Sequence, residues 1–265
     1  MNTHTLTTIL LQTQAHPNEV ERNIRLAQSL VDANPGADLY ILPEMWATGF
    51  ETSPTTATGR ASALAKKWME DTALKNHCAI MGSLAVPAEN NEQTWHNRLY
   101  FITPGGVAAH YDKRHVFRPG LEGRHYKAGN SRVIVCWRGW RILLQVCYDL
   151  RFPVFSRNRN DYDLAVYVAA WPASRGEVWN TLLRARAIEN QCYVCGVNLT
   201  GTDATGYPNA GHSAAIHAKG TPRSLGDEVG ALRAELDLDE LRRFREKFNV
   251  LADADDFRLT PYTPA

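Results

Sequence analysis

Residues 142–153 read Ile-Leu-Leu-Gln-Val-Cys-Tyr-Asp-Leu-Arg-Phe-Pro, and this stretch decides the fold that we expect. Its first half has the composition of a buried strand, which ends at Cys147. Further along the chain, residues 164–170 form another apolar run, and residues 178–190 have the pattern of a helix. Strand and helix therefore alternate around Cys147, which indicates an α/β protein with a thiol at the end of one strand.

The same alternation extends toward both ends of the chain. Residues 18–31 place four apolar side chains on one helical face, which predicts an amphipathic helix. The other expected helices lie at residues 60–75 and after Asp237, and the other expected strands at 5–12, 39–42, 78–86, 95–103, 131–137, 141–147 and 193–198. Arg138-Gly139 predicts a hairpin, so the sheet is mixed rather than wholly parallel. The pattern predicts a layered α/β sandwich in a single domain, residues 1–265.

Composition excludes several classes of protein. The 265 residues are 44% hydrophobic and 22% charged, with a net charge of +1, which excludes a disordered chain and a fibre. This balance gives no reason to expect nucleic acid or a membrane as partner. The N-terminus lacks a signal peptide, and the five scattered cysteines fit reduced thiols, so we expect a cytoplasmic protein.

Common catalytic and nucleotide-binding motifs are absent from the sequence. We find no G-x-G-x-x-G, no G-x-x-x-x-G-K-[ST], no G-x-S-x-G and no H-E-x-x-H. Cys192 and Cys195 have the spacing of a redox or metal pair but lie in a strand-like run. Residues three apart in a strand point to opposite faces, so we expect neither a disulfide nor a metal site there.

Three chemically active side chains each follow a strand-like run. Glu44 ends residues 40–44, Lys113 follows residues 109–112, and Cys147 ends residues 142–147. Each alone has an ordinary structural explanation, because a Glu can cap a loop, a Lys is usually solvated and a Cys is usually part of the core. Together they supply a base, a cation and a nucleophile at strand ends, where sites in α/β proteins tend to lie.

The contexts of these three residues resemble the nitrilase superfamily of carbon–nitrogen hydrolases. The resemblance is carried by Leu42-Pro43-Glu44 with Gly49-Phe50, by residues 111–117 and by residues 146–153, in this order, and extends from about residue 5 to residue 248. It implies a four-layer α-β-β-α sandwich, a small-molecule amide substrate, pairing into homodimers, and no metal or organic cofactor.

Further segments resemble the bacterial omega-amidase branch of that family. They are residues 113–118, 137–142 and 184–191. Glu122 lies where the family has a second active-site glutamate. Gly123 replaces the histidine that often follows it, and His212 and His217 also depart from the usual patterns, whereas the catalytic residues are retained.

The resemblance implies a mechanism. Glu44 takes the proton of Cys147, whose sulfur attacks the amide carbon to form a thioester. Lys113 and the backbone N–H of Tyr148 stabilise the oxyanion, and Glu122 positions the substrate and Lys113. We expect Lys113 to keep both glutamates ionised. We also expect Asp149 and Arg151 to form an ion pair that holds the turn after Cys147.

An omega-amidase hydrolyses the distal amide of a dicarboxylic monoamide such as 2-oxoglutaramate or succinamate. The distant carboxylate needs a cation, and Arg175 is the expected partner because a guanidinium binds a carboxylate through two hydrogen bonds. Trp171 and Phe50 are expected to form apolar walls, with Tyr148 assisting.

Other interpretations remain open. The same fold could serve an N-carbamoyl-amino-acid hydrolase, another aliphatic amidase or a true nitrilase. A papain-like enzyme would use Cys147, His212 and Asn198, although its cysteine usually opens a helix. A binding module without activity would have no need of the four retained residues Glu44, Lys113, Glu122 and Cys147.

Overall fold

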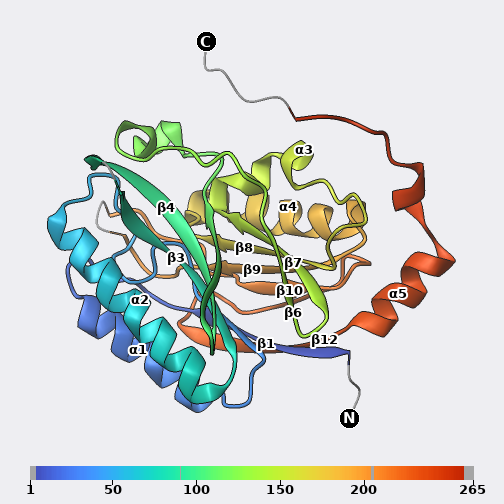
Figure 1. Ribbon diagram of the computed structural model, residues 1–265, viewed down its shortest axis with the longest axis horizontal. Coiled ribbons are helices and arrows are strands. Elements are labelled where there is room, and N and C mark those ends of the chain that lie inside the picture. The colour runs from blue at the N-terminus through green and yellow to red at the C-terminus, as the bar shows by residue number, and fades with distance from the viewer. Residues whose placement is uncertain (1–3, 90, 204–205, 260–265) are drawn as a thin grey trace.

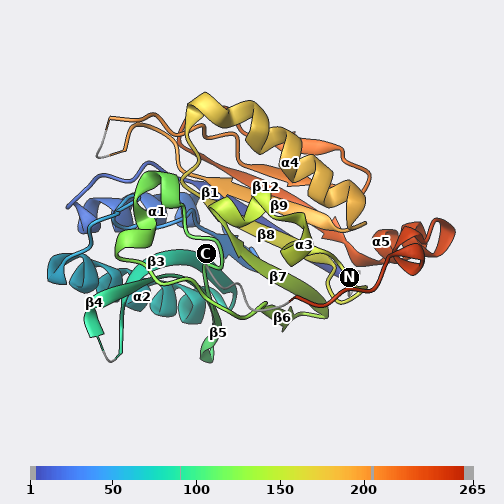
Figure 2. The same cartoon turned by 90° about the horizontal axis from the view of Figure 1, so that it is seen from above.

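In the part of the chain that the structure describes, two mixed sheets of six strands each pack face to face and are covered by helices (Figures 1 and 2). The computed structural model describes residues 4–89, 91–203 and 206–259. Helices α1 (Val20–Ala33) and α2 (Thr56–Asn76) lie on the outer face of one sheet, and α4 (Gly176–Glu189) lies on the outer face of the other. This arrangement confirms the predicted four-layer α-β-β-α sandwich.

The first sheet has the strand order β12-β1-β2-β3-β4-β5. Its strands are β1 (Thr5–Gln12), β2 (Leu39–Ile41), β3 (Ala79–Ala88), β4 (Asn91–Thr103), β5 (Gly106–Asp112) and β12 (Gly230–Asp237). Strands β1, β2 and β3 are parallel, whereas β12, β4 and β5 pair antiparallel with their neighbours. The expected mixed pairing is therefore confirmed.

The second sheet has the strand order β11-β10-β9-β8-β7-β6. Its strands are β6 (Ile134–Trp137), β7 (Trp140–Val146), β8 (Leu164–Ala169), β9 (Tyr193–Asn198), β10 (Ala214–Ile216) and β11 (Pro222–Ser224). The predicted hairpin joins β6 and β7, while β7, β8 and β9 run parallel. Shorter elements are the helices α3 (Pro153–Ser156) and α5 (Leu238–Lys247) and the 3-10 turns η1 (Arg118–Gly120), η2 (Glu122–Arg124), η3 (Cys147–Arg151), η4 (Ala173–Arg175) and η5 (Val250–Asp253).

Alternation along β1 shows how one strand serves two apolar layers. Leu6 and Leu10 belong to the core between the sheets, whereas Ile9 and Leu11 pack beneath the helices. All four side chains are fully buried. Because successive side chains of a strand point to opposite faces, the sheet joins the two layers.

Sequence patterns missed strands β10, β11 and β12. The first two have only three residues each, too few for a periodic signal. Strand β12 is polar on its outer face and pairs with β1 over its full length. In the described ranges, no helix is long and apolar enough to cross a bilayer.

All five cysteines are free thiols, as expected. Cys195 lies within β9 and Cys192 just before it, and both side chains are fully buried. Burial raises the pKa of each thiol to about 12. Neither side chain is suited to redox chemistry, because the reactive form of a cysteine is the thiolate.

Candidate active site

The sandwich brings four of the predicted residues to the end of the two facing sheets. Glu44 follows β2, Lys113 follows β5 and Glu122 opens η2, whereas Cys147 follows β7 of the second sheet and opens η3. Glu44 and Glu122 are fully buried, and Lys113 is 1% and Cys147 8% exposed. Charged groups are seldom buried unless they are paired, so their contacts explain how the fold tolerates them.

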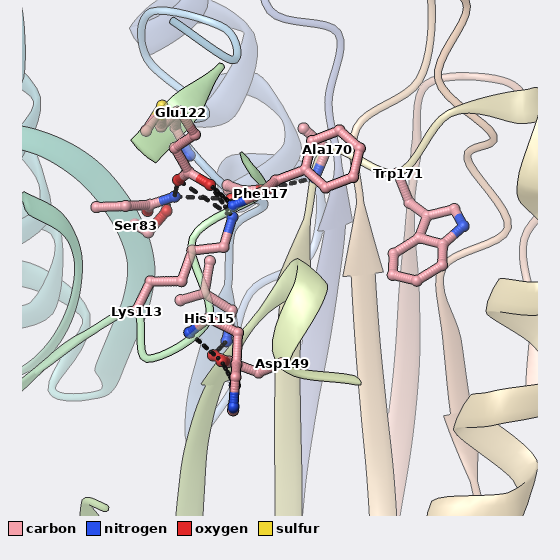
Figure 3. Close-up of polar contacts among 12 residues, drawn as sticks. Ser83, Lys113, His115, Phe117, Glu122, Asp149, Ala170 and Trp171 are labelled. Atoms are coloured by element: carbon pink, nitrogen blue, oxygen red, sulfur yellow. Dashed lines mark hydrogen bonds and ion pairs between the residues drawn. The ribbon is translucent and has the colours of Figure 1, made fainter. Parts of the chain in front are cut away.

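Lys113 is the centre of an ion-pair network (Figure 3). Its Nζ donates to Glu44 Oε1 at 2.7 Å and to Glu122 Oε2 at 2.9 Å. The backbone N–H of Ala170, just after β8, donates to Glu44 Oε2 at 2.8 Å. The base candidate from the first sheet is therefore held by a backbone group of the second sheet. Such charge-assisted hydrogen bonds fix the carboxylate more firmly than neutral ones.

Strained backbone marks the positions of three of these residues. Cys147 has φ +45°, Met45 directly after Glu44 has φ +44°, and Leu121 directly before Glu122 has φ +67°. A side chain with a Cβ in this left-handed region costs on the order of 1–3 kcal/mol. The sharp turn at Cys147 ends β7 and opens η3.

Burial and neighbouring charges set the protonation of the site. Burial and the charge on Glu44 raise the pKa of the Cys147 thiol well above its ordinary value, against the opposing effect of Lys113. The thiol therefore keeps its proton at neutral pH. Since only the thiolate is a strong nucleophile, the site requires a base that receives this proton during attack. Glu44 is the carboxylate placed to do so.

The pKa of Lys113 is raised well above its ordinary value. Burial alone would lower it, but the charges on Glu122 and Glu44 more than compensate, so the ammonium persists. For Glu122, burial raises the pKa beyond what Lys113 can offset, and repulsion from Glu44 adds to the rise. We expected Lys113 to keep both glutamates ionised, but for Glu122 the effect of burial on the pKa is larger than that of Lys113.

The predicted ion pair between Asp149 and Arg151 is wrong. The fully buried carboxylate of Asp149 accepts hydrogen bonds from Tyr111 Oη at 2.7 Å, Val146 N at 3.0 Å, and His115 N and Nδ1 at 3.0 and 2.7 Å. The Arg151 guanidinium instead lies 5.2 Å from the ring centroid of Trp171. Asp149 therefore joins the Cys147 turn to the segment that carries Lys113 (Figure 3).

Three of the predicted substrate-binding residues lie beside this network. The Phe50 ring centroid is 5.5 Å from Lys113 Nζ. The Arg175 guanidinium lies 5.6 Å from the ring centroid of Phe117, which in turn makes an edge contact with Tyr148 at 5.1 Å. Phe117 was not predicted. Its backbone N–H donates to Glu122 Oε2, so it links the ion-pair network to this aromatic group.

Trp171 is placed differently from the apolar wall that we expected. Its side chain is only 3% exposed and packs against Trp179 at a ring separation of 5.6 Å. Its Nε1 donates to the carbonyl oxygen of Arg175 at 2.8 Å. Trp171 thus supports the turn that presents Arg175.

The papain-like alternative does not fit the geometry. Asn198 Oδ1 accepts from Trp171 N at 2.7 Å, and its Nδ2 donates to Trp171 O and Gly211 O at 3.2 and 3.0 Å. The side chain is therefore fully used in holding backbone. The charged groups around Cys147 are Glu44 and Lys113 instead.

Asn97 in β4 is a further site residue that sequence reasoning missed. Its Nδ2 donates to Glu44 Oε1 and to Glu122 Oε1, at 2.7 and 3.0 Å. One buried asparagine in a strand-like run carries no sequence signal of such a role.

Comparisons with known proteins agree with this geometry. A family profile described as carbon–nitrogen hydrolase matches residues 10–246. The chain is 48% identical over 239 residues to omega-amidase YafV of Escherichia coli (strain K12), covering 89% of this chain and 92% of that protein. It is 33% identical to the 2-oxoglutaramate amidase of Bacillus subtilis (strain 168), over 87% of this chain and 90% of that protein.

A solved structure is also similar to this chain in fold and sequence. It is a CN-hydrolase superfamily protein from Xanthomonas campestris, with an arsenic adduct in its active site. It superposes with a TM-score of 0.90 at 38% identity and covers 97% of this chain and 100% of that one.

Proposed function

This chain belongs to the carbon–nitrogen hydrolase family, and we propose that it is an omega-amidase, which hydrolyses the distal amide of a dicarboxylic monoamide to the acid and ammonia. The observation that carries the proposal is the buried network of Glu44, Lys113 and Glu122 beside Cys147. The similarity to omega-amidase YafV and to a 2-oxoglutaramate amidase supports the choice of substrate class.

Acylation begins with Cys147. Glu44 accepts the thiol proton as Sγ attacks the amide carbon, and the carbonyl π electrons move onto oxygen. Lys113 Nζ and the N–H of Tyr148 stabilise this oxyanion. Each such donor is typically worth about 3 kcal/mol. When the intermediate collapses, the C–N bond breaks and Glu44 returns the proton to the leaving ammonia.

Deacylation repeats these steps with water. Glu44 takes a proton from a water molecule, whose oxygen attacks the thioester carbon, and Lys113 again stabilises the oxyanion. The C–S bond then breaks, the carboxylic acid product leaves and the proton on Glu44 returns to Cys147. Glu122 does not exchange protons in this scheme. It holds Lys113 and, through Phe117 N, the segment that lines the site.

The substrate carboxylate binds Arg175. Tyr148 and Phe50 contact the short carbon chain between the two ends of the substrate, and Phe117 lies beneath the guanidinium. A dicarboxylic monoamide places its amide and carboxylate at opposite ends, which matches a thiol at one end and an arginine at the other.

The test is release of ammonia by the purified protein. Substrates are 2-oxoglutaramate and succinamate, compared with glutamine, N-carbamoyl-β-alanine and a simple nitrile, with Cys147→Ala as the blank. We expect release from the two acid amides, loss of that release in Cys147→Ala, and a mass increase of one acyl group on Cys147 in rapidly quenched wild type. Release from the carbamoyl compound or the nitrile alone contradicts the assignment and points to another branch of the family.

The proposal includes a cytoplasmic homodimer. Five free thiols support a reducing compartment. The homodimer follows from the family resemblance, and Val154 of α3 and Ile188 of α4 are apolar side chains that are 55% and 50% exposed. Sedimentation at several protein concentrations tests the dimer.

A further inference from the structure

Asn97 lies between the two carboxylates of the site. Its side-chain nitrogen donates to Glu44 Oε1 at 2.7 Å and to Glu122 Oε1 at 3.0 Å. The residue is 1% exposed, so these hydrogen bonds form away from solvent. An amide nitrogen has two hydrogens, and here each carboxylate accepts one of them.

Lys113 donates to the same two oxygen atoms. The distances are 2.7 Å to Glu44 Oε1 and 3.2 Å to Glu122 Oε1. Two donors and two acceptors therefore alternate in a closed ring, in which one donor is charged and the other neutral. Lys113 must also donate to the oxyanion during the reaction. Asn97 has no such further task, so both Nδ2 hydrogens stay on the glutamates.

The surroundings of Asn97 differ from those of an asparagine that only holds structure. Its carbonyl oxygen accepts Lys113 N at 2.9 Å, and its Oδ1 accepts no hydrogen bond within the described part of the chain. The buried Asn158, by contrast, donates to two backbone carbonyl oxygens and accepts at Oδ1 from Asp161 N. The polar contacts of the Asn97 side chain are thus directed to the two glutamates.

We propose that Asn97 is a positioning residue of the amidase reaction: its Nδ2 holds the carboxylates of Glu44 and Glu122 in place while Lys113 transfers a hydrogen bond to the oxyanion. The inference rests on the proposed function. Asn97 acts through the glutamates, so its loss alters the base Glu44 and leaves the binding of substrate unchanged.

The charges around the pair predict the direction of the effect. Lys113 offsets the repulsion between the two carboxylates. Glu44 also interacts with the Cys147 thiol, and Glu122, Glu51 and Glu44 interact with Tyr126. Removing Nδ2 takes a donor from the ionised form of both carboxylates. A proton then binds them more readily, so the acid limb of activity moves to higher pH.

The experiment compares Asn97→Leu and Asn97→Ala, which both remove Nδ2 without adding charge, with wild type on succinamate between pH 5 and 9. We expect kcat to fall about 10- to 100-fold and KM to stay within about twofold. The pH midpoint of the acid limb of kcat/KM should rise by about one unit. Asn158→Asp is the matched control, because it also disturbs a buried asparagine that donates twice. It should lower the melting temperature and leave the acid limb in place.

A second readout does not depend on amide turnover. Iodoacetamide alkylates Cys147 as the S–C bond forms, the C–I bond breaks and the thiol proton passes to Glu44. Peptide mass spectrometry in a Cys136→Ser background follows this reaction, since Cys136 is the exposed thiol among the five. We expect alkylation at neutral pH to slow in both Asn97 variants and not in Asn158→Asp.

These readouts separate the two proposals. A wild type that is alkylated at Cys147 but releases no ammonia from any amide contradicts the proposed function, while the alkylation rates still decide the role of Asn97. Unchanged kcat, acid limb and alkylation rate in the variants overturn the inference. Where Asn97→Leu does not fold, Asn97→Ala decides, because it also removes Nδ2 and adds neither bulk nor charge beside the glutamates.

Discussion

Arg175 is the residue to which the proposed function assigns substrate selection. Within the described residues its guanidinium forms no ion pair, and its ring contact is with Phe117 at 5.6 Å. The substrate carboxylate can therefore pair with the Arg175 guanidinium without displacing another ion-pair partner. A guanidinium–carboxylate pair in a partly buried site is worth about 1.5–3 kcal/mol.

We expect Arg175→Ala to raise KM for succinamate about 10- to 100-fold, with a small effect on kcat. The matched control is butyramide, an amide of the same length without the carboxylate. It should be a poor substrate of wild type, and the substitution should leave its KM unchanged. Steady-state ammonia release measures both. An equal loss with both amides would mean that Arg175 shapes the pocket and does not bind the carboxylate.

Some residues of the site could be predicted from the sequence and others could not. Glu44, Lys113 and Cys147 each follow a strand-like run and form a recognisable set, so their convergence could be foreseen. Asn97 could not, because its role depends on the register of β4 between β3 and β5, which brings its side chain between two glutamates distant in sequence. The strand pattern predicts that Asn97 is buried and says nothing about its partners.

At the scale of elements, the turn after β7 is held by the neighbouring sheet. Proximity in sequence suggested that Asp149 pairs with Arg151, but residues 149–151 lie in a 3-10 turn that exposes Arg151 and buries Asp149. Three hydrogen bonds to Asp149 join η3 to β5 and the segment after it, and a fourth comes from Val146 N at the end of β7. The turn that carries the nucleophile is therefore tied to the segment that carries Lys113.

We expect Asp149→Asn to destabilise the protein by about 2–4 kcal/mol, because an amide nitrogen cannot accept the hydrogen bonds that one carboxylate oxygen now accepts. The melting temperature should fall by roughly 5–15 °C, and kcat should fall as the turn loosens. Arg151→Ala is the control. Its contact with Trp171 contributes less than about 1 kcal/mol at an exposed position. Thermal unfolding measures the stability of both variants. A large loss of stability in Arg151→Ala would contradict this prediction and support an ion pair between Asp149 and Arg151.

At the scale of the whole molecule, the site lies where the two sheets meet. Glu44 and Lys113 follow strands of the first sheet and Cys147 follows a strand of the second, and Glu44 Oε2 accepts Ala170 N across the boundary. The alternation of strands and helices along the chain predicted the layers, because each sheet packs against the other sheet on one face and against helices on the other. Patterns within one strand could not predict how the sheets are aligned with each other, since that alignment is set by contacts between distant residues.

The alignment of the sheets predicts different effects for two neighbouring leucines of β1. Leu10 faces the core between the sheets and Leu11 faces the helices, and both are fully buried. Replacing either by Ala should cost about 2–5 kcal/mol of unfolding free energy, because each leaves a cavity. Only Leu10→Ala loosens the layer that sets the distance between Glu44 and Cys147, so its kcat should fall more, measured where both variants remain folded. Equal values of kcat in the two variants would contradict this prediction. They would mean that β1 affects stability alone and that contacts at the strand ends align the site.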